Sequence, residues 1–350
     1  MSELNSILKD INKKSNIMNV QIGLEYQEVP KIPFKSCRLN YMTYGGLPEG
    51  RIAEFSGADG SGKTTTALDI FAQAQKMYPD KKALFVDIEH TFDTEWATKL
   101  GIDIDNMIYF DPGSASAEEV FNAILKIVDT GEISIAVLDS LGAMVSEQAT
   151  EKEIGQRTYG GISMPLTEFC KKLTPILART KCIFIGINQQ RADMNSMYGG
   201  TVTTGGKCWL HSCTTRLGFK KGSFIDNDGK NLSRSCENPA GNIVNVDLIK
   251  SKVCRPDRKV GFYTLKYLEG IDYISDTVDV ALLRNIINQS GAWFSIIDIE
   301  TGEILPDENG EPLKFQGKSR LVEELKHNEI LYNYIMEAIK TVEEGKKDEK

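Results

Sequence analysis

The residues best suited to chemistry run from Gly57 to Thr65 and read Gly-Ala-Asp-Gly-Ser-Gly-Lys-Thr-Thr. They fit the phosphate-loop pattern Gly-x4-Gly-Lys-[Ser/Thr] at Gly57, Gly62, Lys63 and Thr64. Glycines let the backbone N–H groups of such a loop turn toward the phosphates of a nucleotide, at the positive end of a helix dipole. Lys63 is expected to neutralise the phosphates and Thr64 to hold Mg2+ through its hydroxyl. The stretch therefore predicts a nucleotide site.

A loop of this kind needs a strand before it and a helix after it. Residues 51–55 are typical of a short strand, and residues 65–76 carry apolar side chains at helical spacing. Three further apolar runs that end in polar residues follow, at 83–89, 133–139 and 182–189. Helix-like stretches lie between them, at 117–128 and 165–179. This alternation predicts an α/β fold with a mostly parallel, doubly wound sheet.

Three polar residues end apolar runs in this layout: Glu89, Asp139 and Gln189. Ligands of a doubly wound sheet bind at the carboxyl ends of its strands, so these side chains are expected beside the phosphate loop. Asp139 is expected to orient the waters around Mg2+. Glu89 is a candidate general base for the water that attacks the γ-phosphate. The predicted reaction is hydrolysis of a nucleoside triphosphate.

Composition narrows the class of protein. A chain of 350 residues that is 41% hydrophobic can bury a large core. Its net charge of −8 argues against binding nucleic acid over the whole surface, although a local basic patch is compatible with it. No apolar run approaches the roughly 18 residues that cross a bilayer, and the N-terminus lacks a signal-peptide layout, so we expect a cytoplasmic protein with no membrane partner. The seven scattered cysteines are expected to be reduced.

Two glycine-rich, polar stretches follow strand ends, at residues 151–161 and 190–207. Such segments are either mobile surface loops or loops that order around a ligand. Their cationic, aromatic and apolar side chains suit single-stranded nucleic acid through backbone contacts and base wedging. The candidates are Arg157, Tyr159, Arg191, Met194, Met197, Tyr198 and Lys207.

Both ends of the chain differ in character from the middle. Residues 3–14 form an amphipathic helix by their spacing, and residues 20–24 alternate like a strand; this arm packs either on its own core or on a neighbouring copy. Near the C-terminus we expect a helix, a strand and a second helix, at 271–290, 291–297 and 321–342. The predicted domains are an arm at 1–35, a core at 36–268, a small α/β domain at 269–345 and a disordered tail at 346–350.

These stretches together resemble one family, the bacterial or phage-type RecA recombinases, over nearly the whole chain. Lys-x-Lys at 250–252, Thr-Thr-Gly-Gly at 203–206 and Gly-Ala-Trp at 291–293 are together specific to this family. The other matching stretches are 45–52, the phosphate loop, 86–90, 99–106, 138–140, 187–189 and 269–271.

The resemblance implies that the nucleotide is ATP, with Mg2+. It makes Glu89 the catalytic carboxylate, Gln189 the sensor of the γ-phosphate, and Lys250 and Lys252 a pair that reaches the ATP of the adjacent subunit. Asp93 and Trp96 match positions that contact adenine. The implied ATP site comprises Gly57, Ala58, Asp59, Gly60, Ser61, Gly62, Lys63, Thr64, Thr65, Asp93, Trp96 and Asp139.

The resemblance also implies partners. The two polar stretches match DNA-binding loops, the second of which includes Gly205 and Gly206, and the N-terminal arm matches one that docks on a neighbouring subunit. A head-to-tail interface that does not close builds a helical filament, and shared ATP stabilises it by linkage. Single-stranded and double-stranded DNA, further copies of the chain, and loader or mediator proteins are the implied partners. The sequence departs from the family pattern at Met164, Asp193 and Leu210-His211.

The function implied is that of an ATP-dependent recombinase, which coats single-stranded DNA, pairs it with a homologous duplex and exchanges strands. The phosphate loop and Asp139 alone also fit a ring helicase or a repair ATPase of related core fold. The lack of a Cys-x2-Cys zinc module argues against the repair ATPase, and Lys250 and Lys252 with the Gly-Ala-Trp segment argue against both. A nucleotide-binding scaffold without turnover is the third reading; intact Lys63 and Glu89 argue against it.

Overall fold

The computed structural model describes residues 3–14, 29–150, 161–192, 201–227, 229–233, 235–255, 257–307 and 309–348. The chain divides into two compact units, Met1–Pro30 and Lys31–Lys350. The first unit holds helix α1 (Glu3–Lys14), which confirms the amphipathic helix predicted there. The strand expected at residues 20–24 lies outside the described residues.

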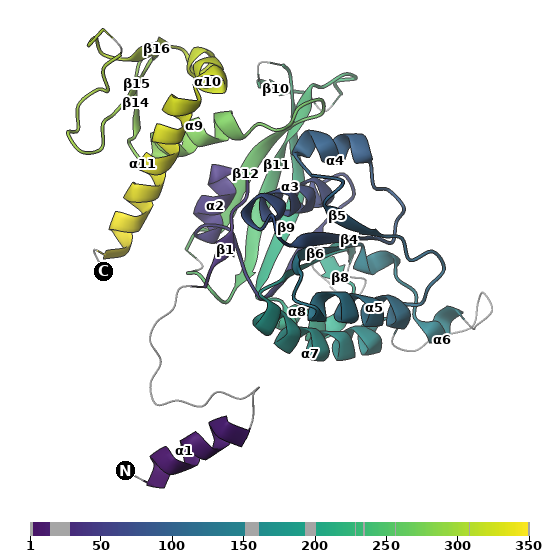
Figure 1. Ribbon diagram of the computed structural model, residues 1–350. Coiled ribbons are helices and arrows are strands. Elements are labelled where there is room, and N and C mark those ends of the chain that lie inside the picture. Colours follow the sequence, from purple (N-terminus) through teal and green to yellow (C-terminus); the bar gives the residue numbers. More distant parts are fainter. Residues whose placement is uncertain are drawn as a thin grey trace. The chain divides into compact units, whose positions relative to one another are not determined.

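The second unit is built on a sheet of eleven strands (Figure 1). Along the sheet the order is β13-β12-β11-β9-β3-β7-β6-β4-β5, with β10 paired to β9 and β8 paired to β7. The strands are β3 (Ile52–Gly57), β4 (Lys82–Asp87), β5 (Met107–Phe110), β6 (Ile133–Asp139), β7 (Ile183–Ala192), β8 (Thr201–Thr203), β9 (Thr215–Ile225), β10 (Asn231–Leu232), β11 (Gly241–Ser251), β12 (Val260–Lys266) and β13 (Gly270–Ile271).

The strands from β9 through β3, β7, β6 and β4 to β5 are parallel. This confirms the parallel sheet predicted from the buried apolar runs. On the other side of β9 the strands β11, β12 and β13 pair antiparallel. That extension was not predicted from the sequence. Its strands β11 and β12 alternate buried and less buried residues, as expected for a sheet with one face on the core and one toward water.

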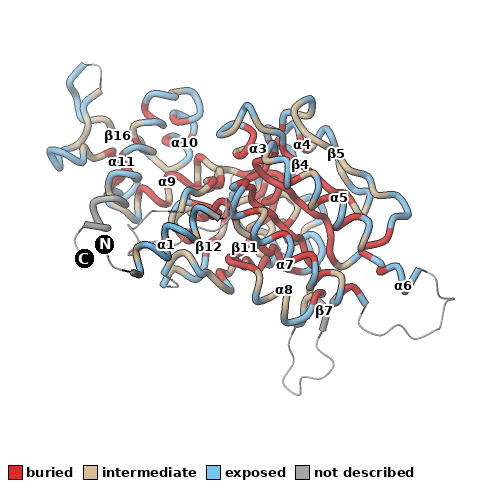
Figure 2. Tube along the Cα trace, turned by 60° about the horizontal axis from the view of Figure 1, so that its bottom comes forward, coloured by how far each residue is buried: buried red, intermediate tan, exposed pale blue. Residues whose placement is uncertain are grey.

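Helices cover both faces of the parallel strands (Figure 1). One buried cluster joins α3 to Phe55 and Phe85 of the sheet, and a second joins α5, α7 and α8 to the opposite face around Phe184. Figure 2 shows these buried residues concentrated in the middle of the molecule. The elements are β1 (Lys31–Ile32), α2 (Cys37–Thr43), β2 (Leu47–Pro48), α3 (Lys63–Met77), α4 (Thr94–Leu100), α5 (Ala117–Asp129), the 3-10 turn Leu141–Ala143, α6 (Glu147–Thr150), α7 (Ser163–Thr180) and α8 (Gly206–Ser212).

The C-terminal part has its own buried cluster, shared by helices and a three-stranded antiparallel sheet. Its elements are α9 (Tyr273–Leu283), β14 (Ile287–Ser290), β15 (Trp293–Ile296), β16 (Lys314–Gln316), α10 (Lys318–His327) and α11 (Glu329–Asp348). The strand expected at 291–297 is confirmed as β15. The mixed α/β character expected of this part is therefore present.

The extents predicted for both C-terminal helices were wrong. The helix expected over 271–290 ends at Leu283, because Asn285 takes a left-handed backbone conformation (φ 58°) and the chain then pairs as β14. The helix expected over 321–342 is two helices, separated at Asn328, whose side chain accepts from the backbone N–H of Leu331 (3.0 Å) and starts α11. The backbone of α11 continues to Asp348, where a disordered tail was expected, since Glu and Lys favour helix.

A buried carboxyl group joins the C-terminal part to the core. Asp276 of α9 accepts from the Ser36 hydroxyl (2.5 Å) and from the backbone N–H of Arg38 (3.0 Å), both at the start of α2. Beside it, the Cys37 thiol lies 3.3 Å from the Thr277 hydroxyl. All seven cysteines are free, as expected. Among the described residues, no helix is long and apolar enough to span a bilayer.

Asp69, inside α3, generates a prediction about stability. Only one of its carboxyl oxygens has a partner among the described residues, the backbone N–H of Lys35 (3.0 Å), and burial raises its pKa from 3.8 to about 6. Between these two pH values the folded chain holds a proton that the unfolded chain has released, so a rise in pH across this window destabilises the fold.

We expect the free energy of unfolding of Asp69→Asn, relative to the native protein, to rise by about 3 kcal/mol between pH 4 and pH 7, because a pKa difference of about two units is removed. Urea unfolding at a series of pH values measures this difference. Exposed Asp80→Asn is the control and should show a nearly constant difference. A constant difference for Asp69→Asn as well contradicts the expectation.

Candidate active site

The phosphate loop connects β3 to α3, and its glycines are needed where they stand. Gly60 and Gly62 have positive φ values of 65° and 96°, which side-chain-bearing residues rarely adopt. A Cβ on Gly57 would lie 2.4 Å from the carbonyl oxygen of Phe219 and 2.7 Å from Ser61 Oγ. The backbone therefore curls tightly at the N-terminus of a helix, which is the arrangement that binds phosphate.

Lys63 and Ser61 present polar groups inside this loop. Lys63 is 8% exposed, and its Nζ donates to the carbonyl of Ala58 (2.9 Å) across the loop. Burial lowers its pKa, while the nearby carboxyl groups of Asp59, Asp139 and Glu89 oppose that shift. Ser61 Oγ is buried and has no hydrogen-bond partner among the described residues. A buried cation and an unpaired hydroxyl in a glycine cradle fit a phosphate group.

Thr64 and Asp139 meet at the first turn of α3. The Thr64 hydroxyl donates to Asp139 Oδ2 at 2.6 Å, although 75 residues separate them in sequence. Burial raises the pKa of Asp139 to about 6, against the opposing effect of the Thr64 hydrogen bond. A hydroxyl and a carboxyl group side by side form an oxygen donor set of the kind that Mg2+ prefers. The pair predicted from the sequence is thus brought together.

Glu89 and Gln189 lie next to this pair. Gln189 Nε2 donates to Glu89 Oε1 at 3.4 Å, and the Ser140 hydroxyl donates to the same oxygen. Gln189 stands opposite Gly57 in the β3–β7 register, which places it at the edge of the sheet where the loop begins. Ser140 was not predicted to act here. Its position directly after Asp139, in one of the stretches that resemble the family, was the available signal.

A second unpredicted residue supports the loop from the antiparallel extension. Tyr263 of β12 is fully buried, and its hydroxyl lies 2.7 Å from the Thr66 hydroxyl and 3.4 Å from the carbonyl of Gly62. The Thr66 hydroxyl in turn donates to the same carbonyl at 2.8 Å. The antiparallel extension, which was not predicted, therefore contacts the N-terminal end of α3, to which the phosphate loop connects.

The two residues expected to contact adenine lie at α4. Asp93 is the N-cap of this helix: its carboxylate accepts from the backbone N–H groups of Glu95 (2.9 Å) and Trp96 (3.1 Å). Asp93 is exposed, and Trp96 is half-buried against the main core. This capping role accounts for Asp93 on structural grounds, and the adenine contact stays a prediction.

Most residues expected to bind DNA lie outside the described residues: Arg157, Tyr159, Met194, Met197 and Tyr198. The segment 193–200 is flanked by β7 and β8, which pair antiparallel with Arg191 opposite Val202. Lys207 is exposed at the start of α8. Gly205 has φ 108°, and a Cβ there would lie 2.6 Å from Leu166, so close packing requires this glycine whether or not DNA approaches it.

Lys250 and Lys252 both contact the C-terminal end of α8. Lys250 Nζ donates to the carbonyl of Leu210 (2.5 Å), and Lys252 Nζ donates to that of His211 (2.8 Å). Cations are favoured at the negative end of a helix dipole. Within one chain the lysine pair therefore binds backbone carbonyls, and its expected reach to a neighbour's ATP stays a prediction.

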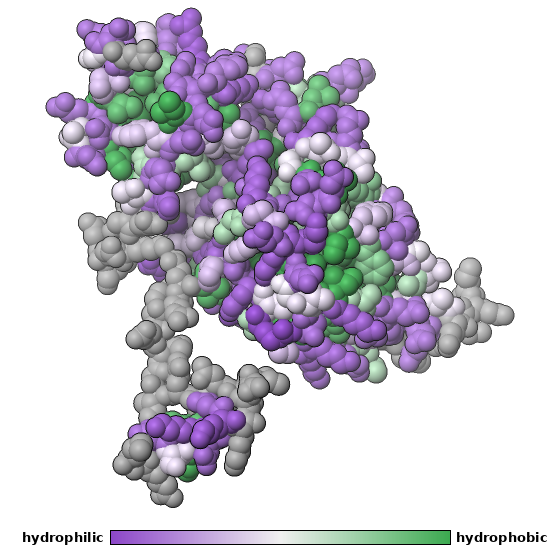
Figure 3. Space-filling view, in the orientation of Figure 1, coloured by the Kyte–Doolittle hydropathy of each residue, from purple (hydrophilic) through white to green (hydrophobic). Residues whose placement is uncertain are grey.

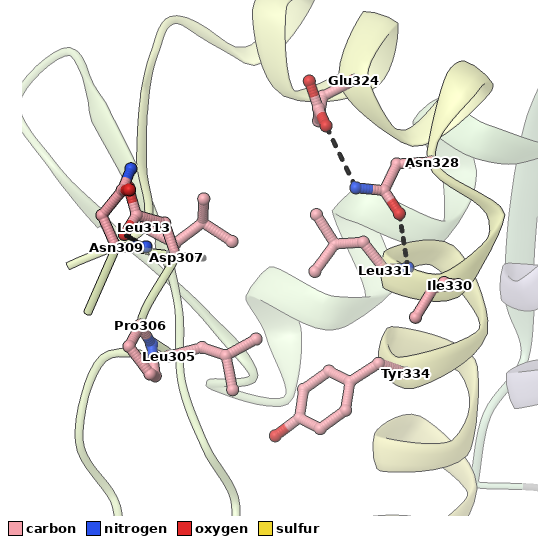
Figure 4. Close-up of a pocket in the computed structure, with 10 residues that line it drawn as sticks. All are labelled: Leu305, Pro306, Asp307, Asn309, Leu313, Glu324, Asn328, Ile330, Leu331 and Tyr334. Atoms are coloured by element: carbon pink, nitrogen blue, oxygen red, sulfur yellow. Dashed lines mark hydrogen bonds between the residues drawn. The ribbon is translucent and has the colours of Figure 1, made fainter. Parts of the chain in front are cut away.

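A cavity of about 430 Å3 lies elsewhere, in the C-terminal part (Figure 4). Leu305, Leu313, Leu331 and Tyr334 line it, and its described lining includes Asp307 and Glu324 but no basic residue. That makes the cavity unsuited to phosphate.

Figure 3 shows that hydrophilic side chains cover most of the face seen in Figure 1.

The chain is similar to known proteins over most of its length. Residues 2–272 match the family model of the RecA N-terminal domain. Protein RecA of Chloroherpeton thalassium is 34% identical over 345 residues, which are 97% of this chain and 89% of the relative. Protein RecA of Chlorobaculum tepidum is 32% identical, over 99% of this chain and 94% of the relative.

Among solved structures, the RadB recombinase is 21% identical with a TM-score of 0.49, over 67% of this chain and 96% of that one. The family model covers more than two thirds of the chain, and each of the two relatives aligns with almost all of it. The chain therefore belongs to the RecA family of recombinases.

Proposed function

We propose that the candidate active site binds ATP with Mg2+ and hydrolyses it, while the chain, as a RecA-family recombinase, pairs single-stranded DNA with a homologous duplex and exchanges strands in recombination and repair. The observation that carries the proposal is the meeting of Thr64 with Asp139 at the phosphate loop, with Glu89 and Gln189 beside them. Membership in the RecA family of recombinases favours this function over a helicase or a nucleotide-binding scaffold without turnover.

Each residue has a role that follows from its position. Lys63 and the loop N–H groups would neutralise the phosphates, and the Thr64 hydroxyl with Asp139, through water, would hold the Mg2+. When bound, ATP supplies the γ-phosphoryl group that is transferred to water. Glu89 accepts the proton of that water. Ser140 and Gln189 hold Glu89 Oε1 between them, which leaves its other oxygen for the water.

The assembly belongs to the same proposal. Residues 151–161 and 190–207 bind DNA, the arm at 1–35 docks on a neighbouring subunit, and Lys250 and Lys252 reach the neighbour's ATP in a helical filament. Family membership supports these roles, as does the placement of β8 and α8 directly after the segment 193–200. The core at 36–268, the C-terminal domain at 269–345 and dependence on loader proteins are proposed with them.

The test is joint-molecule formation between a labelled single strand and a supercoiled duplex, with ATP and Mg2+. We expect product only from homologous strands, and loss of product in Lys63→Ala because the phosphates lose their buried cation. Lys76→Ala, an exposed lysine of the same helix, is the matched control and should retain product. ATP turnover stimulated by DNA without any joint molecules would contradict the strand-exchange activity.

Ser140→Ala tests the placement of Glu89. General-base catalysis is worth about 10^2- to 10^4-fold, so partial loss of Glu89's orientation should lower kcat for ATP by about tenfold with little change in KM. Steady-state turnover measures both constants. Ser134→Ala is the control: this serine lies in β6, the strand that Ser140 directly follows, and is buried like Ser140, but its hydroxyl donates to the carbonyl of Lys82. Equal effects of the two substitutions would show that Ser140 acts only on stability.

A further inference from the structure

A carboxylate is fully buried in β3, three residues before the phosphate loop. Glu54 has no solvent exposure. Its Oε1 accepts from Asn188 Nδ2 (3.0 Å) and Trp209 Nε1 (2.7 Å), and its Oε2 accepts from Arg216 Nε (2.5 Å). The signal available in the sequence was one acidic residue between the apolar Ala53 and Phe55 of a strand.

The three donors come from three different elements: Asn188 from β7, Trp209 from α8 and Arg216 from β9. A buried charge is tolerated only when it is paired and its remaining lone pairs are hydrogen-bonded. Because Glu54 meets that condition with all three donors at once, any displacement of β7, α8 or β9 relative to β3 breaks a contact of a buried charge. These elements are therefore positioned together.

Asn188 connects Glu54 to both sides of the candidate active site. Its Nδ2 also donates to the carbonyl of Thr204 (2.8 Å), and its Oδ1 accepts from the backbone N–H of Thr204 (3.3 Å). Thr204 directly follows β8, the strand that returns from the segment 193–200. The next residue along β7 is Gln189, which contacts Glu89. One side chain thus contacts the end of the proposed DNA loop and adjoins the proposed γ-phosphate sensor.

Trp209 connects Glu54 to the lysine pair. Trp209 is fully buried. A Cβ added to Gly186 of β7 would lie 2.6 Å from the Trp209 ring, and a Cβ added to Gly205 would lie 3.0 Å from the Cβ of Trp209. The ring therefore has no room to move unless α8 moves with it. The far end of α8 is bound by Lys250 and Lys252.

We propose that Glu54 is the positioning residue that couples DNA binding to ATP hydrolysis: DNA binding displaces Thr204 and α8, and Glu54 transmits this displacement to the Gln189–Glu89 pair and to Lys250 and Lys252. The inference rests on the proposed function. Its physical basis is a contiguous set of contacts of which a buried charge is the centre.

The test compares ATP turnover with and without saturating single-stranded DNA in Glu54→Gln, which keeps the shape of the side chain and removes its charge. Allosteric couplings are typically worth about 5- to 150-fold, so we expect the ratio of stimulated to basal turnover to fall by at least about fivefold. Asp276→Asn is the matched control, since it is also a buried carboxyl group bonded near an arginine. It should lower the thermal stability and keep the ratio.

Asn188→Ala removes the side chain that joins Glu54 to Thr204 and leaves the contacts of Glu54 with Trp209 and Arg216 in place. It serves as a second variant should Glu54→Gln fold poorly, and it should lower the ratio in the same way. In the double variant the two losses should not add, because both act on one set of contacts. If the ratio keeps its native value in both single variants, the inference is overturned and the proposed function still stands. Basal and stimulated turnover that fall in proportion also overturn it, since that is the result of a purely structural role. If single-stranded DNA does not stimulate ATP turnover by the native protein, the proposed function is overturned as well.

Discussion

The parallel pairing of β3, β7, β6 and β4 is the constraint on which the rest of the site depends. In this register Gly57 lies opposite Gln189, and Asp87 lies opposite Asp139. Gly57 and Gln189, which are 132 positions apart in sequence, therefore end at one edge of the sheet. A slip of one residue in this pairing would turn every side chain of a strand to the other face.

Buried ionisable groups are the second organising feature. Asp69, Asp139 and Asp276 all have pKa values raised by burial, and each accepts a hydrogen bond from a different part of the chain. Lys63 has its pKa lowered for the same reason. Such groups cost stability, so hydrophobic packing around Phe55, Phe85 and Phe184 must offset them. Two of the four, Lys63 and Asp139, lie at the candidate active site, where perturbed groups are commonly found.

The sequence was sufficient for the parts of the fold that have a local signature. The phosphate loop, the apolar runs that end at Glu89, Asp139 and Gln189, and the helices α3, α5 and α7 follow from spacing alone. Contacts such as Glu54 with Trp209, or Tyr263 with Gly62, have no such signature, because they join residues more than 150 positions apart. The ends of α9 and α10 were missed because single asparagines, in a left-handed conformation or as a cap, decided them.

The contact between the lysine pair and α8 uses only backbone carbonyls on the helix side. The side chains of Leu210 and His211 therefore do not take part in it. These are positions at which the sequence departs from the family pattern. Evolutionary drift at 210 and 211 can thus proceed without loss of this contact, and the constraint falls instead on the length of the helix, because one residue more or less would carry its last carbonyls away from both lysines.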